Sequence, residues 1–150
     1  MEIQDKLIEA TMDIFSSMVM MEITVKEIMT EHGQLQDSIT GMIGLAGTHK
    51  GVLAVHFPYT VAMAITSSFL MMDVEEINED VHDAVGEIAN MLGGNVKTIL
   101  SEKGRDIDLS LPSTIAGSQY SFQSDKQIEK VIITFDTGVG TFMVEMDLEK

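Results

Sequence analysis

The segment from residue 83 to residue 100 constrains the fold most strongly, because it divides between two faces at about 100° of helical turn per residue. One face is apolar and consists of Val85, Ile88, Ala89, Leu92, Val96, Ile99 and Leu100. The other face, about 80° wide, is a polar stripe that consists of Asp83, Glu87, Asn90, Gly94 and Lys97. The pattern predicts a long amphipathic helix whose apolar face packs on a core.

Three glycines within this predicted helix, Gly86, Gly93 and Gly94, need a physical reason. A glycine in a helix interior costs about 1 kcal/mol relative to alanine. We interpret the glycines as room for another surface to approach Glu87 and Asn90. A glutamate on a helix is commonly a solvated charge, but a mid-helix asparagine is unfavourable because it competes for backbone hydrogen bonds. The combination therefore indicates a functional face.

The rest of the chain predicts an α+β fold in a single domain, 1–150, with helices packed on a mostly antiparallel sheet. Helices are expected over 4–22, 59–72 and about 78–103, the last of them capped by Asn78 or Asp80 and ended by Gly104. Strands are expected over 39–47, 52–57, 107–111, 131–135 and 140–146, and a loop over 113–118.

The last predicted strand suggests self-association. It alternates Phe142, Val144 and Met146 with polar residues and contains no proline. At the edge of a sheet such a strand would pair with another chain, which favours a homodimer.

Composition excludes several classes of partner and chemistry. The chain has 9 basic and 24 acidic residues and a net charge of −15, so neither nucleic acid nor an anionic membrane is an expected partner. The sequence contains no run of eighteen apolar residues, so it predicts no membrane span. The absence of cysteine excludes disulfides, thiolate catalysis and zinc–sulfur sites, and it suits a cytoplasmic protein.

The four histidines do not have the spacing of a metal site. His32, His49, His56 and His82 form no H-x3-H or similar pattern, so the sequence predicts no metal bound by this chain. No glycine-rich phosphate loop or nucleophile elbow is present either, which leaves a free-standing hydrolase poorly supported.

The polar stripe resembles the D-x3-E-x2-N…P signature of the CheC/CheX/FliY family of chemotaxis phosphatases. Asp83, three residues, Glu87, two residues, Asn90 and twenty-one residues to Pro112 follow that order. The run GEIANMLGGN, residues 86–95, is also similar to the active helix of the family. The resemblance implies a CheC-like domain that removes the phosphoryl group from the aspartyl phosphate of a CheY-type response regulator.

The resemblance also implies roles for individual residues. Hydrolysis of an aspartyl phosphate depends on positioning and electrostatics more than on covalent catalysis. Asn90 would orient the attacking water, and Glu87 would contact the lysine of the regulator. Asp83, Gly94 and Pro112 would support the site, although Asp83 also suits the start of a helix and Pro112 also suits a strand end. The Mg²⁺ would come from the receiver domain, so the chain would need no cofactor of its own.

Each half of the chain contains a predicted helix followed by a predicted hairpin with several glycines, which predicts a degenerate internal duplication. Asp13, Ser17 and Met20 fall at the matching spacing in the first helix, but Ser17 and Met20 cannot reproduce the chemistry. One site per chain resembles CheX, and CheX proteins form two-fold dimers through their sheets. The alternative is a non-catalytic module of the same fold that docks on a receiver or a flagellar-switch protein.

Overall fold

The computed structural model describes residues 2–101, 106–122 and 128–149. Its helical elements are α1 (Glu2–Ile14), a π-helical turn η1 (Phe15–Val19), α2 (Tyr59–Leu70) and α3 (Glu79–Leu100). Its strands are β1 (Thr24–Met29), β2 (Leu35–Gly47), β3 (Gly51–Pro58), β4 (Ile107–Leu109), β5 (Ser113–Tyr120), β6 (Ile128–Asp136) and β7 (Thr141–Glu149). None of the helices in these residues is long and apolar enough to cross a membrane.

The strands form one antiparallel sheet in the order β1-β6-β7-β3-β2-β4, and β5 pairs with another part of β2. The predicted hairpins are confirmed as β2–β3 and β6–β7. The second hairpin turns at Gly138 and Gly140, which both have positive φ and so occupy backbone conformations that glycine adopts without strain. The α+β class is therefore confirmed.

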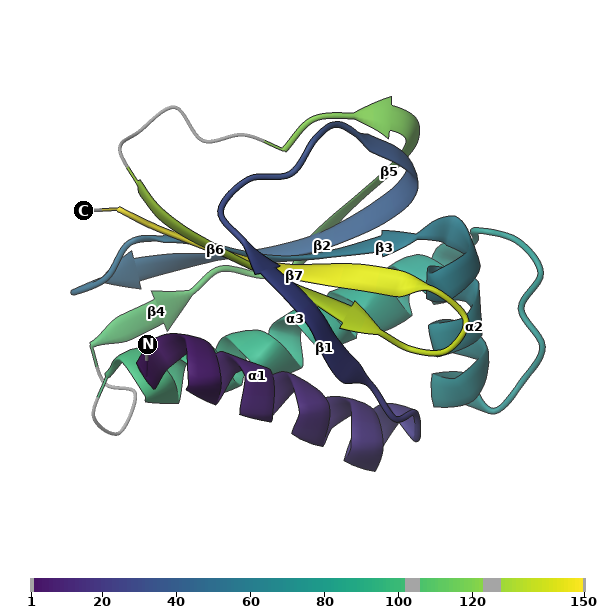
Figure 1. The fold of residues 1–150 in the computed structure, drawn as a ribbon, viewed down its shortest axis with the longest axis horizontal. Coiled ribbons are helices and arrows are strands. Elements are labelled where there is room, and N and C mark those ends of the chain that lie inside the picture. Colours follow the sequence, from purple (N-terminus) through teal and green to yellow (C-terminus); the bar gives the residue numbers. More distant parts are fainter. Residues whose placement is uncertain (1, 102–105, 123–127, 150) are drawn as a thin grey trace.

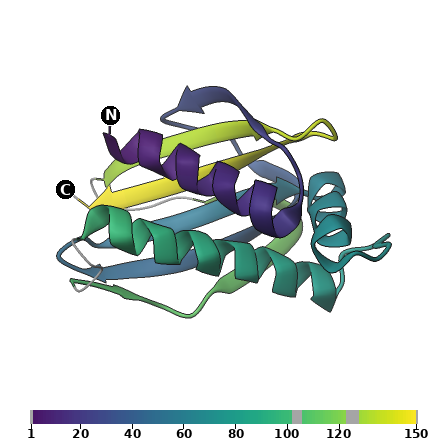
Figure 2. The ribbon, with the colours of Figure 1, turned by 90° about the horizontal axis from the view of Figure 1, so that it is seen from below.

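The helices cover one face of the sheet (Figure 1). Seen from below, α1 and α3 lie side by side along that face and α2 stands at one end (Figure 2). Alternate residues of each central strand point toward these helices. In β3 they are Leu53, Val55 and Phe57, which are fully buried in the core.

Several predicted boundaries shift. The first helix extends from Glu2 through η1 and ends at Val19, because Met20 has a left-handed conformation with φ of 62°. The long helix ends at Leu100, earlier than expected, and the predicted stop at Gly104 lies outside the described residues.

The prediction of a loop over 113–118 is wrong, because these residues belong to β5 and pair with β2. Most β5 side chains are exposed or half-buried, so the segment lacks the apolar alternation by which a strand is recognised. Its backbone hydrogen bonds to β2 hold it in the sheet.

The expectation that the last strand lies at an edge is also wrong. Strand β7 lies inside the sheet between β6 and β3, and Phe142, Val144 and Met146 are buried under the helices. The free edges belong to β1 at one end of the sheet and to β4 and β5 at the other. The strand pattern of β7 therefore gives no argument for a dimer.

Candidate active face on helix α3

Helix α3 forms where the sequence predicts a long amphipathic helix. The side chain of Asn78 caps its first turn by accepting a hydrogen bond from the Val81 N–H at 3.2 Å. Glu79 and Asp80 lie in the first turn, where their negative charge suits the positive end of the helix dipole. The apolar face is buried against the sheet, which anchors the helix along its length.

The polar stripe lies on the outward face of α3. Asp83, Glu87, Asn90 and Gly94 are exposed, and Lys97 is half-buried. Within the described part of the chain, the side chains of Asp83, Glu87 and Asn90 make no hydrogen bond or ion pair. Glu87 and Asn90 are separated by about one helical turn, so they present a carboxylate and a carboxamide together to an approaching molecule.

The three glycines of α3 have different surroundings. Gly93 is buried, and a Cβ there would lie 3.1 and 3.2 Å from two side-chain carbons of Ile43. Gly86 is also buried, with a Thr114 methyl group 3.7 Å from the same position. Our interpretation of the glycines is therefore wrong for Gly93, which permits close packing on β2. Of the three, only Gly94 is exposed; among the described residues, a Cβ there would meet no atom within 4 Å apart from the adjacent backbone of its own helix, and its small size suits the approach of a partner.

Pro112 lies in the connection that passes along α3. On one side of this connection, Leu109 approaches the Gly93 position to 3.6 Å. On the other side, the Thr114 hydroxyl lies 2.7 Å from His82 Nδ1. The two contacts show that the segments on either side of the exposed Pro112 pack on α3, one at Gly93 and the other at His82.

Leu111, next to this proline, was missed by the sequence reasoning. We expected it to end a half-buried strand, but β4 ends at Leu109 and the side chain of Leu111 is 87% exposed. The adjacent Pro112 was the available signal, because proline has no N–H to donate to a strand ladder and often ends the pairing of a strand. Leu111 therefore adds an exposed apolar side chain to the connection between β4 and β5.

The corresponding positions of the first helix form no equivalent face. Asp13 and Ser17 are exposed, but the Ser17 hydroxyl donates a 2.6 Å hydrogen bond to the Asp13 carbonyl. Met20 follows the end of the helix. The internal duplication stays a prediction, and only α3 carries a carboxylate and an amide at the signature spacing.

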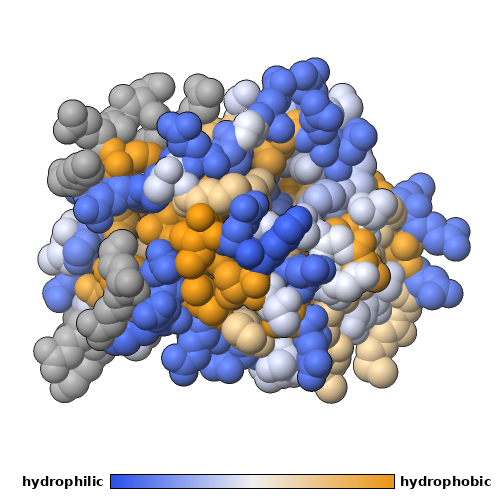
Figure 3. Space-filling model, in the orientation of Figure 1, coloured by the Kyte–Doolittle hydropathy of each residue, from blue (hydrophilic) through white to orange (hydrophobic). Residues whose placement is uncertain are grey.

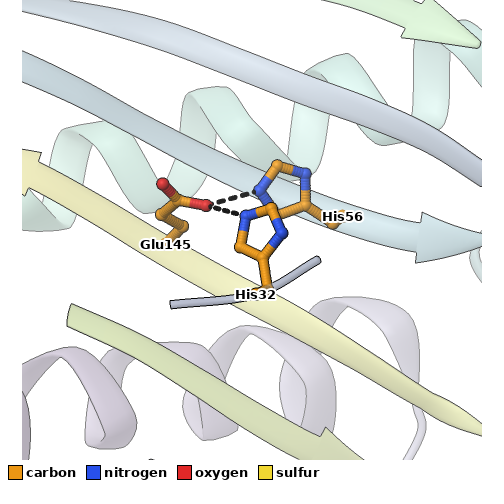
Figure 4. A group of neighbouring side chains, drawn as sticks. All are labelled: His32, His56 and Glu145. Carbon is orange, nitrogen blue, oxygen red and sulfur yellow. Dashed lines mark hydrogen bonds and ion pairs between the residues drawn. The ribbon is translucent and has the colours of Figure 1, made fainter. Parts of the chain in front are cut away.

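A second group of polar side chains lies on the opposite face of the sheet, where the sequence predicted no site. His32, His56 and Glu145 point toward one another from the β1–β2 connection, β3 and β7 (Figure 4). Glu145 Oε1 lies 2.7 Å from His32 Nε2 and 2.9 Å from His56 Nε2. The Lys130 ammonium lies 3.1 Å from the other oxygen of the same carboxylate.

The surroundings of this group shift its pKa values. Burial lowers the pKa of His56, in spite of the hydrogen bond to Glu145. Burial alone would raise the pKa of Glu145, but the contacts with His56 and Lys130 outweigh it and hold that pKa below its usual range. Burial and the adjacent Glu145 carboxylate raise the pKa of Asp147.

Comparison with known proteins identifies the family. The family described as "Chemotaxis phosphatase CheX" matches residues 39–136, which include the whole of α3. A curated relative, "CheY-P phosphatase CheX" of Thermotoga maritima, is 26% identical over 112 residues, which cover 74% of this chain and 72% of that protein.

Solved structures agree with this match. A CheC-like superfamily protein from Shewanella sp. PV-4 superimposes with a TM-score of 0.88 at 27% identity and covers 99% of this chain and 98% of its own. A chain of a CheX–CheY–BeF3–Mg²⁺ complex from Borrelia burgdorferi superimposes with a TM-score of 0.79 at 20% identity. The match covers 98% of this chain and 97% of the Borrelia chain, and it shows a shared fold. The chain belongs to the CheX family of chemotaxis phosphatases.

Proposed function

We propose that this chain hydrolyses the aspartyl phosphate of a CheY-type response regulator and that Glu87 and Asn90 are its catalytic pair. The observation that carries the proposal is the exposure of both side chains, one turn apart and without a partner of their own, on a helix anchored by its opposite face. The name of the Thermotoga relative and the CheX–CheY complex from Borrelia support the choice of substrate.

In this mechanism Asn90 positions the water. A carboxamide can accept a hydrogen bond from the attacking water and donate one to a phosphoryl oxygen at the same time. Because the transition state of phosphoryl transfer is loose, holding the water in line supplies most of what a catalyst can contribute. The receiver would bring the phosphoryl group with its Mg²⁺, which neutralises charge on the phosphoryl oxygens.

Glu87 fixes the approach of Asn90. Its carboxylate can form a charge-assisted hydrogen bond with a lysine beside the phosphoryl group of the receiver. The exposed Leu111 and Pro112 offer the receiver an apolar contact, and Gly94 leaves room for the receiver surface. Asp83 lies in the second turn of α3, beyond the turn where the helix dipole acts, so it would support the site as a further negative charge on the polar stripe.

The test is the loss of phosphate from a panel of phosphorylated receivers, measured with and without this chain. The proposal expects faster loss for at least one receiver and no acceleration by Asn90→Ala. Tight binding to a receiver without any acceleration would instead support the non-catalytic docking module.

We also propose that the chain forms a two-fold homodimer through β1. This strand lies at a free edge of the sheet, and Val25 and Ile28 on it are 38% and 46% exposed. Figure 3 shows hydrophobic side chains gathered in the middle of the face that β1 crosses. A second copy that pairs with this edge would cover them. The α3 helices lie away from β1, so each subunit could still hold one receiver.

A further inference from the structure

The group formed by His32, His56 and Glu145 has a feature that two neutral imidazoles and a carboxylate alone do not explain. His32 Nδ1 lies 2.8 Å from the Gly33 carbonyl oxygen, which can only accept, so this nitrogen must carry a proton. In the neutral ring Nε2 then carries a lone pair, and that lone pair faces a carboxylate oxygen 2.7 Å away. Two acceptors at this distance require a positive charge, either an additional proton or a metal ion.

His56 is oriented in a compatible way. Its Nδ1 lies 2.7 Å from the Thr40 hydroxyl, which in turn lies 2.7 Å from the Tyr120 hydroxyl. If Nδ1 donates to Thr40 and Thr40 donates to Tyr120, the Nε2 lone pair of His56 is also directed at Glu145 Oε1. An imidazole whose Nδ1–H is held by an oxygen acceptor, with Nε2 free, is the usual form of a metal-binding histidine.

The ligand atoms are close enough to share one ion. The two Nε2 atoms and the carboxylate oxygen all lie within 4.8 Å of one another. Ligands at about 2.0–2.2 Å from a tetrahedral zinc ion are roughly 3.4 Å apart, so small side-chain rotations from the observed 2.7 and 2.9 Å would be sufficient.

The positive charge of Lys130 opposes a second cation nearby, and the Asp147 carboxylate partly offsets that charge. Lys130 contacts Oε2 of Glu145 and leaves Oε1 to the imidazoles, while the Asp147 carboxylate lies 3.8 Å from the same ammonium. His56 lines a cavity of about 290 Å³ together with Thr134, whose buried hydroxyl has no partner among the described residues. Of the three ligands only His56 lines this cavity, so a water that acts as the fourth ligand would enter the site from the side of His56.

We propose that His32, His56 and Glu145 form a structural site for a divalent transition metal of the zinc class. The ion would join the β1–β2 connection to β3 and β7, because the three ligands come from those segments. Nitrogen and carboxylate ligands without thiolates favour zinc over softer copper(I). The site lies across the sheet from α3, is separate from any Mg²⁺ of a receiver, and does not depend on the proposed phosphatase activity.

The test is a zinc titration of the full chain after treatment with a chelator, read by competition with a chromophoric chelator. We expect one zinc per chain. His32→Gln should weaken binding by about 100-fold or more, since it removes a ligand outright. The matched control, His49→Gln, changes an exposed histidine in the β2–β3 turn and should bind zinc as the wild type does.

Two further readouts keep the test decisive. Cobalt(II) should give the strong visible absorption of a tetrahedral site in the wild type and lose it in His32→Gln. Zinc should raise the melting temperature of the wild type but not of His32→Gln, whose circular dichroism should show a retained fold. Absence of zinc binding, or binding that His32→Gln leaves unchanged, would overturn the proposal and leave a proton-bridged network in its place.

Discussion

Asn90 must both accept and donate a hydrogen bond from one short side chain if it is to orient water at a phosphoryl group. We therefore expect Asn90→Ala to slow dephosphorylation by about 10² to 10³-fold, by analogy with the removal of one oxyanion-hole donor. Receiver binding should be nearly unchanged, because most of the contact surface remains. Phosphate release and binding are measured separately to distinguish the two effects.

A matched control is available on the same helix. Asn95 is also an exposed asparagine of α3 but lies outside the polar stripe, so Asn95→Ala should leave turnover unchanged. Equal losses in the two variants would mean that Asn90 acts through helix stability and not through water.

Glu87 should behave differently, because its proposed partner is a charge on the receiver. Glu87→Ala should weaken receiver binding as well as turnover, and added salt should weaken binding less in this variant than in the wild type. The control is Glu9→Ala, which removes an exposed glutamate from α1. Titration calorimetry at two salt concentrations measures the effect, and an unchanged affinity in Glu87→Ala would contradict the docking role.

At the scale of one helix, the glycines of α3 give a prediction about stability. Gly94→Ala should stabilise the chain by up to about 1 kcal/mol, because alanine is the better helix former and its Cβ would meet no described atom beyond the adjacent backbone of its own helix. Gly93→Ala should be less stable than Gly94→Ala, because its Cβ forces the buried Ile43 to move. Urea unfolding of both variants measures the difference.

The functional role of Gly94 is tested by a larger side chain at the same position. Gly94→Leu should be at least as stable as the wild type, because leucine is also a better helix former than glycine, and yet it should slow dephosphorylation, since the leucine would fill the space needed by the receiver. Wild-type turnover in this variant would show that no surface approaches Gly94 closely.

The elements that could be predicted from the sequence are those whose side chains repeat with a clear period. Helix α3 shows a period of 3.6 over 22 residues and an identifiable cap at Asn78, so its type and its outward face were predictable. Strand β5 has no such period, because it is held by backbone pairing with β2 and none of its side chains is fully buried. Leu111 was missed for a different reason: the alternation over 107–111 continues through it, but β4 ends at Leu109 and leaves Leu111 exposed.

At the scale of the whole molecule, the arrangement of strands decides which surfaces are free for self-association. If the dimer forms through β1, Ile28→Lys should give a monomer of 16.5 kDa by light scattering at micromolar concentration. Ile115→Lys, an equally exposed substitution on β5 at the other edge of the sheet, should leave the dimer intact. A monomeric wild type would contradict the proposed dimer.

Strand order also explains why part of the molecule could not be predicted. The alternation in β7 shows that one of its faces is buried, but alternation is the same for an edge strand and a central strand. The meeting of His32 with Glu145 likewise joins residues 113 positions apart, which no local spacing reveals. The polar stripe was predictable because all its members lie on one helix.

The outward position of Asn90 also determines what kind of molecule could be a substrate or an inhibitor. Four surface cavities of about 290 to 600 Å³ are lined by other residues, and none of them includes Glu87 or Asn90. A small phosphorylated metabolite on this exposed face of α3 would stay surrounded by bulk water, whereas small molecules bind well in concave sites. If Asn90 acts as proposed, the partner protein must supply the surfaces that exclude water from the reacting phosphoryl group. A competitive inhibitor would then have to cover the exposed face of α3, as a folded protein or peptide does.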